Sequence, residues 1–329
     1  MTKFKTVKIK GFVPLAGTPR RLEVHISYSC TQHCVFCSEA SRLKNFSGHH
    51  FPPAELAALL KEKRALGFSH VTFTGGEPTL LAYLPQMLAI AKKLGYTTYI
   101  TSNGQLLREQ TIFDKVVENL DELCLSFHSA DAETQDALSR SPGGAHKLAQ
   151  TLELLRRSKK DIFLLTNTVV TRQNLRELPA IIKCAAKTGK LRHCLFSYPA
   201  PEGRGFKNFG ELAVDFKKLH AEIPALARTA RNCGATLRFF GVPACVLGKY
   251  AALANDRYFS PRVTIERAMR GGNISRREIT TAAPVRRRVY LPCCARCAQV
   301  SRCGGIFRAY LDKFGKAGIT PLRRPLPKV

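Results

Sequence analysis

The sequence predicts an α/β protein, a partial (β/α)6 TIM-like barrel followed by a small cysteine-rich domain. Over residues 21–232, short apolar runs alternate with longer amphipathic ones, the pattern of parallel strands separated by helices. Cysteines, glycines and prolines gather in residues 233–329, where no clear alternation remains. With 329 residues, 45% hydrophobic and 23% charged, the chain can bury a large core and is not wholly disordered.

The barrel prediction depends on six strand–helix units. The candidate strands are Leu22–Ser27, Val71–Thr74, Thr97–Thr101, Leu123–Phe127, Ile162–Val170 and Cys194–Tyr198. The candidate helices are Ala54–Leu66, a stretch from Pro85 to Gly95, and residues 105–120, 145–158, 174–188 and 211–231. Six units fall short of the eight of a closed barrel, so we expect an open barrel with its site at the C-terminal ends of the strands.

The second helical pattern carries its own start and stop signals. Pro85 stands where proline is favoured, at the first helical position, and Gly95 stands where a C-terminal glycine belongs. The apolar side chains between them fall on one face: Leu84, Met87, Leu88, Ala91 and Leu94. That face predicts a helix packed against the sheet.

Three parts are expected along the chain. Residues 1–20 form a basic N-terminal segment, residues 21–232 the barrel, and residues 233–329 a second, smaller module. No stretch approaches the ~20 uninterrupted apolar residues that cross a bilayer. The N-terminus also lacks the roughly 7–15-residue apolar block of a secretory signal, so we expect a cytoplasmic protein without a membrane partner.

The strongest chemical signal follows the first strand, where Cys30, Cys34 and Cys37 have the spacing C-x3-C-x2-C. Three thiolates on one loop can converge on one metal centre, one ligand short of a closed site. A [4Fe–4S] cluster held in this way keeps one iron open, as a catalytic site requires. A zinc site completed by His33 or by a distant cysteine is the alternative.

The second strand ends in a glycine pair, Gly75-Gly76, followed by Glu77 and Pro78. Paired glycines at the end of a strand let backbone groups approach a ligand closely. Parallel strands end at the same edge of a sheet, so this loop faces the same side as the cysteine loop.

Together these motifs resemble the radical S-adenosylmethionine (SAM) superfamily over residues 20–200. The resemblance lies in the cysteine triad with Phe36 inside it, in the GGEP sequence, and in Thr101–Gly104 and Ser126–His128 after later strands. It implies that the triad holds a [4Fe–4S] cluster whose open iron takes SAM. The cofactor chemistry would produce a 5′-deoxyadenosyl radical that abstracts a hydrogen atom from the substrate.

The resemblance also implies roles for individual residues around SAM. Gly75, Gly76 and Glu77 would contact the SAM amino group, and Phe36 would lie near the adenine. Asn103, Ser126 and Asn167 stand at strand ends where such enzymes contact ribose or carboxylate groups, although each also suits an ordinary turn or cap. We expect His128 to be packed or hydrogen-bonded rather than a catalytic base. No residue is assigned as an acid or base.

A second group of cysteines lies near the C-terminus. Cys293, Cys294, Cys297 and Cys303, with Cys245 upstream, supply more than the four thiolates of a closed site. The segment resembles the Twitch or SPASM-like modules of many radical SAM enzymes, which implies a second, auxiliary [4Fe–4S] cluster. Either Cys293 or Cys294 would be a ligand, and a zinc ribbon has compatible spacing. The four other cysteines stand singly, as buried thiols do: Cys124, Cys184, Cys194 and Cys233.

The charge is unusual, since 52 Lys and Arg against 24 Asp and Glu give +28. The last 74 residues alone hold 17 basic and four acidic residues. Such a surface suits a nucleic acid, an acidic flavodoxin- or ferredoxin-type electron donor, or an acidic peptide, or it is solvated charge. No RNA-binding motif with interleaved aromatic residues accompanies it.

We therefore expect a radical SAM enzyme that modifies a peptide or protein, as maturases of ribosomally made peptides do. Modification of a nucleotide, an RNA or a small molecule such as a sugar, by epimerisation, dehydrogenation or cyclisation, is the alternative. A non-catalytic iron–sulfur protein is a third hypothesis, which the intact triad and GGEP sequence oppose.

Overall fold

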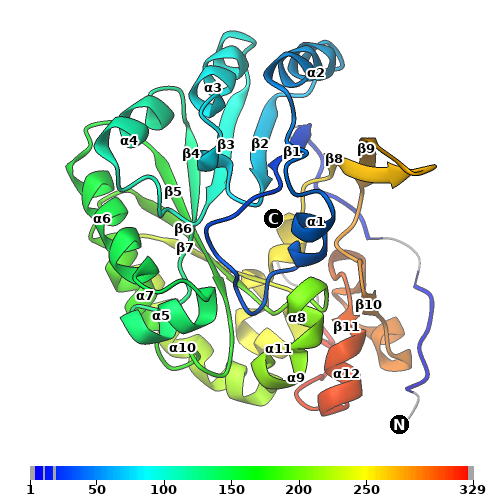
Figure 1. Ribbon diagram of the computed structural model, residues 1–329. Helices are drawn as coiled ribbons and strands as arrows, with labels where there is room; N and C mark the ends of the chain where they lie inside the picture. The colour runs from blue at the N-terminus through cyan, green and yellow to red at the C-terminus, as the bar shows by residue number, and fades with distance from the viewer. Residues whose placement is uncertain (1–3, 10–11, 18–19, 325–329) are drawn as a thin grey trace.

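A curved nine-stranded sheet organises the computed structural model, which describes residues 4–9, 12–17 and 20–324. The strand order is β7-β6-β5-β4-β3-β2-β1-β8-β9. All neighbours from β7 to β8 are parallel, and only β9 is antiparallel to its partner. Figure 1 shows the sheet curved into an open barrel, with α2, α3, α4, α6, α7 and α10 on its outer face.

The strands are β1 (Arg21–Ser27), β2 (His70–Gly75), β3 (Thr97–Ser102), β4 (Glu122–Ser126), β5 (Phe163–Val169), β6 (Leu191–Ser197), β7 (Thr236–Phe240), β8 (Arg262–Arg270), β9 (Asn273–Thr281), β10 (Arg288–Val289) and β11 (Ile306–Phe307). The α-helices are α1 (Ala40–Asn45), α2 (Pro53–Ala65), α3 (Leu84–Lys93), α4 (Gln110–Val117), α5 (Ala132–Ser139), α6 (Gly144–Arg157), α7 (Leu178–Ala186), α8 (Gly203–Lys207), α9 (Phe209–Leu212), α10 (Phe216–Asn232), α11 (Ala244–Leu247) and α12 (Arg308–Phe314). Short 3-10 helices are η1 (Pro78–Leu80), η2 (Gly248–Leu253), η3 (Asn255–Tyr258), η4 (Pro292–Arg296) and η5 (Val300–Arg302).

The six predicted strands and the helices between them are confirmed. Parallel strands lie between helices and the barrel interior, so their side chains are buried on both faces and read as apolar runs. In β1, for example, Leu22, Val24 and Ile26 are all fully buried. In α3, Pro85 lies in the first turn, and Gly95, just after the helix, has a φ of +80°.

The sheet is larger than predicted, because β7, β8 and β9 extend it beyond residue 232. The β8–β9 hairpin lacks the apolar alternation of an ordinary strand pair. Its charged side chains form ion pairs instead, both within the hairpin and with α2. Arg267 pairs with Glu55 of α2 at 2.8 Å, and Arg277 pairs with Glu266 within the hairpin. The boundary between residues 232 and 233 stays a prediction, and the sheet itself runs across it.

The cysteine-rich C-terminal segment packs on one end of the barrel through aromatic rings. The ring of Tyr310 in α12 stacks on Phe216 of α10 with centroids 3.7 Å apart, and the Phe216 backbone N–H donates to its hydroxyl. Part of the N-terminal segment lies along this module, where Val7 forms a bridge with Tyr290. Residues 1–3, 10–11 and 18–19 of that segment lie outside the described residues.

None of the helices in the described part of the chain is long and apolar enough to cross a membrane.

Candidate active site

The C-terminal ends of the parallel strands surround a cavity of about 300 Å³. Nearly all residues that the sequence predicted to bind the first cluster and SAM line this cavity: Cys30, Cys34, Phe36, Cys37, Gly75, Gly76, Asn103, Ser126 and Asn167. They come from the ends of β1 to β5, so residues up to 137 positions apart in the chain meet at one edge of the sheet. The cavity lies where the fold class predicts the site.

The glycine pair binds the end of β2 to the loop after β1. The N–H of Gly76 donates to the Ser27 carbonyl at 2.8 Å, and the N–H of Glu77 donates to the Ser29 carbonyl at 2.8 Å. A Cβ on Gly75 would lie 2.3 Å from the Ser27 oxygen, and one on Gly76 would lie 2.1 Å from the Ser29 oxygen. Gly75 also has a φ of +119°, so this close approach requires glycine.

Glu77 has a different place from the other predicted residues, since its side chain is fully buried and does not line the cavity. Its carboxylate accepts hydrogen bonds from the Thr79 hydroxyl at 2.7 Å, the Ser102 hydroxyl at 2.8 Å and the Asn103 N–H at 2.7 Å. Burial raises the pKa of Glu77, and these donors oppose the rise. The side chain thus joins the ends of β2 and β3 beneath the cavity.

The cysteine loop is also held from two further sides. On one side, the N–H groups of His33 and Val35 donate to carbonyls of α5 at 3.0 and 2.9 Å. On the other, Arg204 of α8 donates to the Cys37 carbonyl through its backbone and to the Cys34 carbonyl through Nε, both at 2.9 Å. These bonds fix the course of the loop backbone, and all three cysteines line the cavity.

Burial raises the pKa of all three thiols of the triad. Burial raises the pKa of Cys30 to about 11 and that of Cys34 to about 12, and neighbouring thiols of the triad raise both further. Burial also raises the pKa of Cys37. A bound cation would offset this and release the protons. Among the described residues, no group of three or more His, Cys, Asp and Glu side chains is arranged to hold a metal ion.

Phe36 and His128 form the apolar wall of the cavity. Their rings meet edge to face with centroids 4.5 Å apart. The Val169 N–H donates to Nδ1 of His128 at 3.2 Å, and burial lowers the pKa of this histidine to about 3. A neutral, hydrogen-bonded imidazole confirms the expectation that His128 is packed.

The sequence interpretation missed the contribution of β6. Ser197 lines the cavity and donates a hydrogen bond to the side-chain oxygen of Asn167 at 2.7 Å, which orients that amide. Tyr198 and Ala200 follow it along the rim. The available signal was position alone, since Ser197 is the residue before the last in the sixth predicted strand, Cys194–Tyr198.

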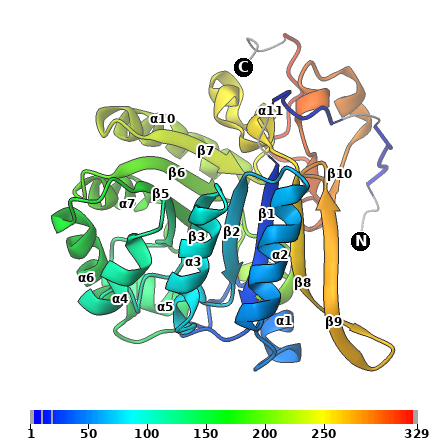
Figure 2. The same ribbon diagram turned by 90° about the horizontal axis from the view of Figure 1, so that it is seen from above.

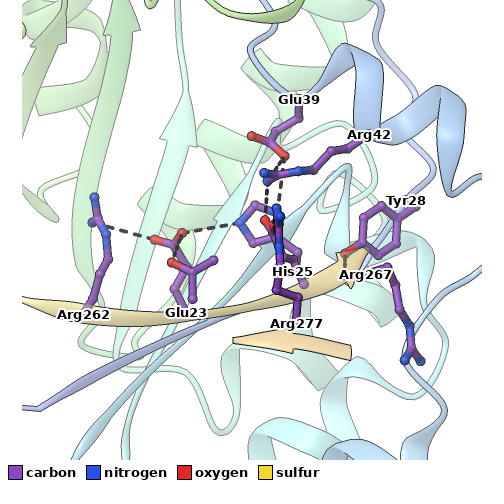
Figure 3. A network of polar contacts seen from close by, with 10 residues as sticks. Glu23, His25, Tyr28, Glu39, Arg42, Arg262, Arg267 and Arg277 are labelled. Carbon is purple, nitrogen blue, oxygen red and sulfur yellow. Dashed lines mark hydrogen bonds and ion pairs between the residues drawn. The ribbon is translucent and has the colours of Figure 1, made fainter. Parts of the chain in front are cut away.

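A second, charged pocket of about 180 Å³ adjoins the cavity and shares Glu39, Ala200 and Phe240 with it. Figure 3 shows His25 between Glu23 and Glu39, with each carboxylate 3.4 Å from a ring nitrogen. Burial alone would lower the pKa of His25, but the two carboxylates raise it to about 9. Arg262 lies 3.7 Å from Glu23, and with His25 it lowers the pKa of that buried carboxyl to about 2.

The buried Glu266 continues this network. Arg42 of α1 and Arg277 of β9 both bind its carboxylate, while Arg42 also lies 3.2 Å from Glu39. Opposite charges therefore alternate along one wall of the charged pocket.

The second cysteine group lies apart, in the C-terminal module. Four of its five members line one small cavity of about 20 Å³: Cys245, Cys294, Cys297 and Cys303. Burial raises the pKa of Cys245 to about 12, and the nearby Cys297 and Cys294 thiols raise it further. Cys293 is exposed and does not line this cavity.

Comparison with known family models finds one similarity. Residues 24–185 match the family model of the Radical SAM superfamily. This match includes the cysteine triad and the glycine pair, so this part of the chain is similar to a radical SAM domain.

The fold is similar to that of solved radical SAM enzymes. SuiB from Streptococcus suis, bound to the precursor peptide SuiA, matches with a TM-score of 0.55 and 16% identity over 75% of this chain and 57% of that one. SuiB from the same organism bound to S-adenosylmethionine matches with a TM-score of 0.55 and 20% identity, over 75% of this chain and 58% of that one. Native anSMEcpe with bound AdoMet and Kp18Cys peptide matches with a TM-score of 0.52 and 19% identity, over 66% of this chain and 63% of that one. The chain thus spans 57–58% of the SuiB chains, and the likeness concerns the fold.

Replacement of Gly76 by alanine tests the close approach at the end of β2. The new Cβ has no room beside the Ser29 oxygen, so Gly76→Ala should lower the free energy of unfolding by about 1–3 kcal/mol. Gly210→Ala is the matched control, because its Cβ would meet only Nζ of Lys313 at 3.8 Å. Equal urea midpoints for Gly76→Ala and the wild type would refute the packing argument.

The pH dependence of stability tests the His25 network. Because the pKa of His25 is raised from 6.5 to about 9, its charge stabilises the fold fully below pH 6.5 and the contribution is lost as pH rises towards 9. His25→Gln should flatten this part of the profile in urea unfolding, whereas the exposed His146→Gln should leave it unchanged. An equally steep decline in His25→Gln would show that His25 is not the group responsible.

Proposed function

We propose that the protein cleaves SAM reductively and abstracts a hydrogen atom from a peptide or protein substrate. The main support for SAM cleavage is the cavity, because the cysteine triad, the glycine pair and polar residues at the strand ends all line it. The support for a peptide substrate is the likeness in fold to SuiB and anSMEcpe, whose structures contain peptides.

The first cysteine group fits an iron–sulfur cluster. Cys30, Cys34 and Cys37 provide three soft ligands on a loop whose backbone is fixed from three directions. When bound there with SAM, the cluster would supply a 5′-deoxyadenosyl radical. The chain's own task is to position SAM and the substrate and to keep water away from them.

The remaining residues of the cavity perform that positioning. Gly75 and Gly76 line the cavity at the end of β2, where their backbone would contact SAM. Phe36 and His128 present a neutral apolar wall suited to the adenine ring. Asn103, Ser126 and Asn167 offer hydrogen-bonding groups on the opposite strand ends.

Cys245, Cys294, Cys297 and Cys303 would hold the auxiliary [4Fe–4S] cluster. Two observations support this assignment. The four cysteines line one cavity, and burial and neighbouring thiols of the group raise the pKa values of Cys245 and Cys303. Four cysteines close a site, so this group serves electron transfer or structure rather than SAM binding. An acidic flavodoxin- or ferredoxin-type donor would supply the electron, which suits a chain of charge +28.

SAM cleavage is tested with reconstituted protein under anaerobic conditions. The wild type, reduced with dithionite, should release 5′-deoxyadenosine from SAM, and Cys34→Ala should release none, because the triad would be incomplete. Cys184→Ala on α7 is the control and should behave as the wild type. If the wild type, with its cluster present and reduced, forms no 5′-deoxyadenosine, the proposal fails.

Metal analysis tests the second site and its ligands. Two [4Fe–4S] clusters give close to eight irons per chain, and Cys294→Ser should reduce this to about four. Cys293→Ser should keep all the iron, because Cys293 lies outside the cavity of the other four. One zinc with about four irons in the wild type would contradict the auxiliary cluster. Iron loss in Cys293→Ser alone would contradict the ligand choice.

A further inference from the structure

The sheet ends in an open edge at β9. Among the described residues, β9 has β8 on one side and no strand on the other, as Figure 2 shows at the border of the molecule. The turn Gly271-Gly272, with φ of +55° and +83°, is a two-residue hairpin turn that makes Arg270 and Asn273 a hydrogen-bonded pair. Hydrogen bonding alternates along antiparallel strands, so every second residue of β9 directs its N–H and C=O outward: Ile274, Arg276, Glu278 and Thr280.

The two faces of β9 have different neighbours. On one face, Glu278 lies 2.6 Å from Lys63 of α2, and Arg276 lies 3.6 Å from Glu62. On the other face, Arg277 binds the buried Glu266, and the next alternate residues, Ile279 and Thr281, line the charged pocket. β9 therefore has one face towards α2 and the other towards that pocket.

The charged pocket connects this edge with the SAM cavity, because Glu39, Ala200 and Phe240 line both spaces. A strand added beside β9 would continue both faces of the sheet. Every second side chain of the added strand would then point to the same side as Ile279 and Thr281, towards the charged pocket.

We propose that the substrate peptide binds in extended form as an additional strand on β9 and delivers one residue into the charged pocket. The proposal rests on the proposed radical SAM function. Main-chain hydrogen bonds at a sheet edge provide affinity, and pockets for alternate side chains provide specificity. An open edge strand of nine residues would pair with other chains and aggregate. A substrate peptide that binds there explains why the edge is left open.

Charge defines the kind of peptide. Residues 262–281 carry five arginines and two glutamates, within a chain of charge +28, so acidic residues in the peptide complement the hairpin. The pocket presents carboxylates and guanidinium groups together, including Glu23, Glu39 and Arg262, so the delivered residue is polar. Peptide association should therefore weaken as salt rises.

The test removes one outward N–H from β9 without touching the β8–β9 pairing. Thr280 is exposed, and proline is tolerated on edge strands where the N–H faces solvent. The probe is a library of short random peptides selected on the reconstituted wild-type enzyme. Selected peptides should bind Thr280→Ala like the wild type and Thr280→Pro about fivefold more weakly, since a hydrogen bond contributes about 1 kcal/mol and tenfold corresponds to about 1.4 kcal/mol.

A second measurement keeps the proposal testable if Thr280→Pro folds poorly. N-methylation of single amides along a selected peptide should weaken binding at every second position only, because alternate amides face β9. Equal binding to Thr280→Pro, no alternation, or a library without binders would overturn the proposal. A dimer that Thr280→Pro dissociates would assign the edge to a second copy instead.

The function and the binding mode can fail separately. If dithionite-driven 5′-deoxyadenosine formation without peptide is equal in Thr280→Pro and the wild type while peptide binding is also equal, only the binding mode is wrong. If the wild type forms none, the proposed function itself is wrong.

Discussion

The site depends on two backbone hydrogen bonds between the end of β2 and the loop after β1. They run from Gly76 to Ser27 and from Glu77 to Ser29, both at 2.8 Å. Only glycine allows these two backbone segments to approach so closely, since a Cβ on either Gly75 or Gly76 would overlap a carbonyl oxygen. The cysteine loop begins directly after Ser29, so these bonds determine where its three thiols lie.

Glu77 extends the same constraint to β3. Its buried carboxylate fixes Thr79, Ser102 and the backbone of Asn103, and the Asn103 side chain then donates to the Thr31 hydroxyl at 2.9 Å. The loop after β1 is therefore connected to the ends of both neighbouring strands. Together with the bonds from α5 and α8, this arrangement holds the loop in place before any cofactor binds, which is what a reactive centre needs.

Local signals made much of this predictable from the sequence. The apolar runs of buried parallel strands, Pro85 and Gly95 at the ends of α3, and the cysteine spacing each depend on a few neighbouring residues. Contacts between distant residues were not predictable. The partnership of Arg42 with Glu266 spans 224 positions, and the β8–β9 hairpin is stabilised by such ion pairs rather than by apolar alternation. The burial of the Glu77 side chain likewise depends on packing and cannot be read from sequence spacing. The same holds for the exposure of Cys293 beside the partly buried Cys294.

The central claim is that the triad holds a cluster whose open iron binds SAM within the strand-end cavity. Electron–nuclear double resonance on the reduced, reconstituted enzyme tests it directly, with SAM isotopically labelled at the methionine nitrogen. The account predicts a hyperfine coupling between the cluster spin and that nitrogen, lost in the Cys34→Ala variant. A reduced cluster in the wild type that shows no coupling to the labelled nitrogen at saturating SAM would contradict it.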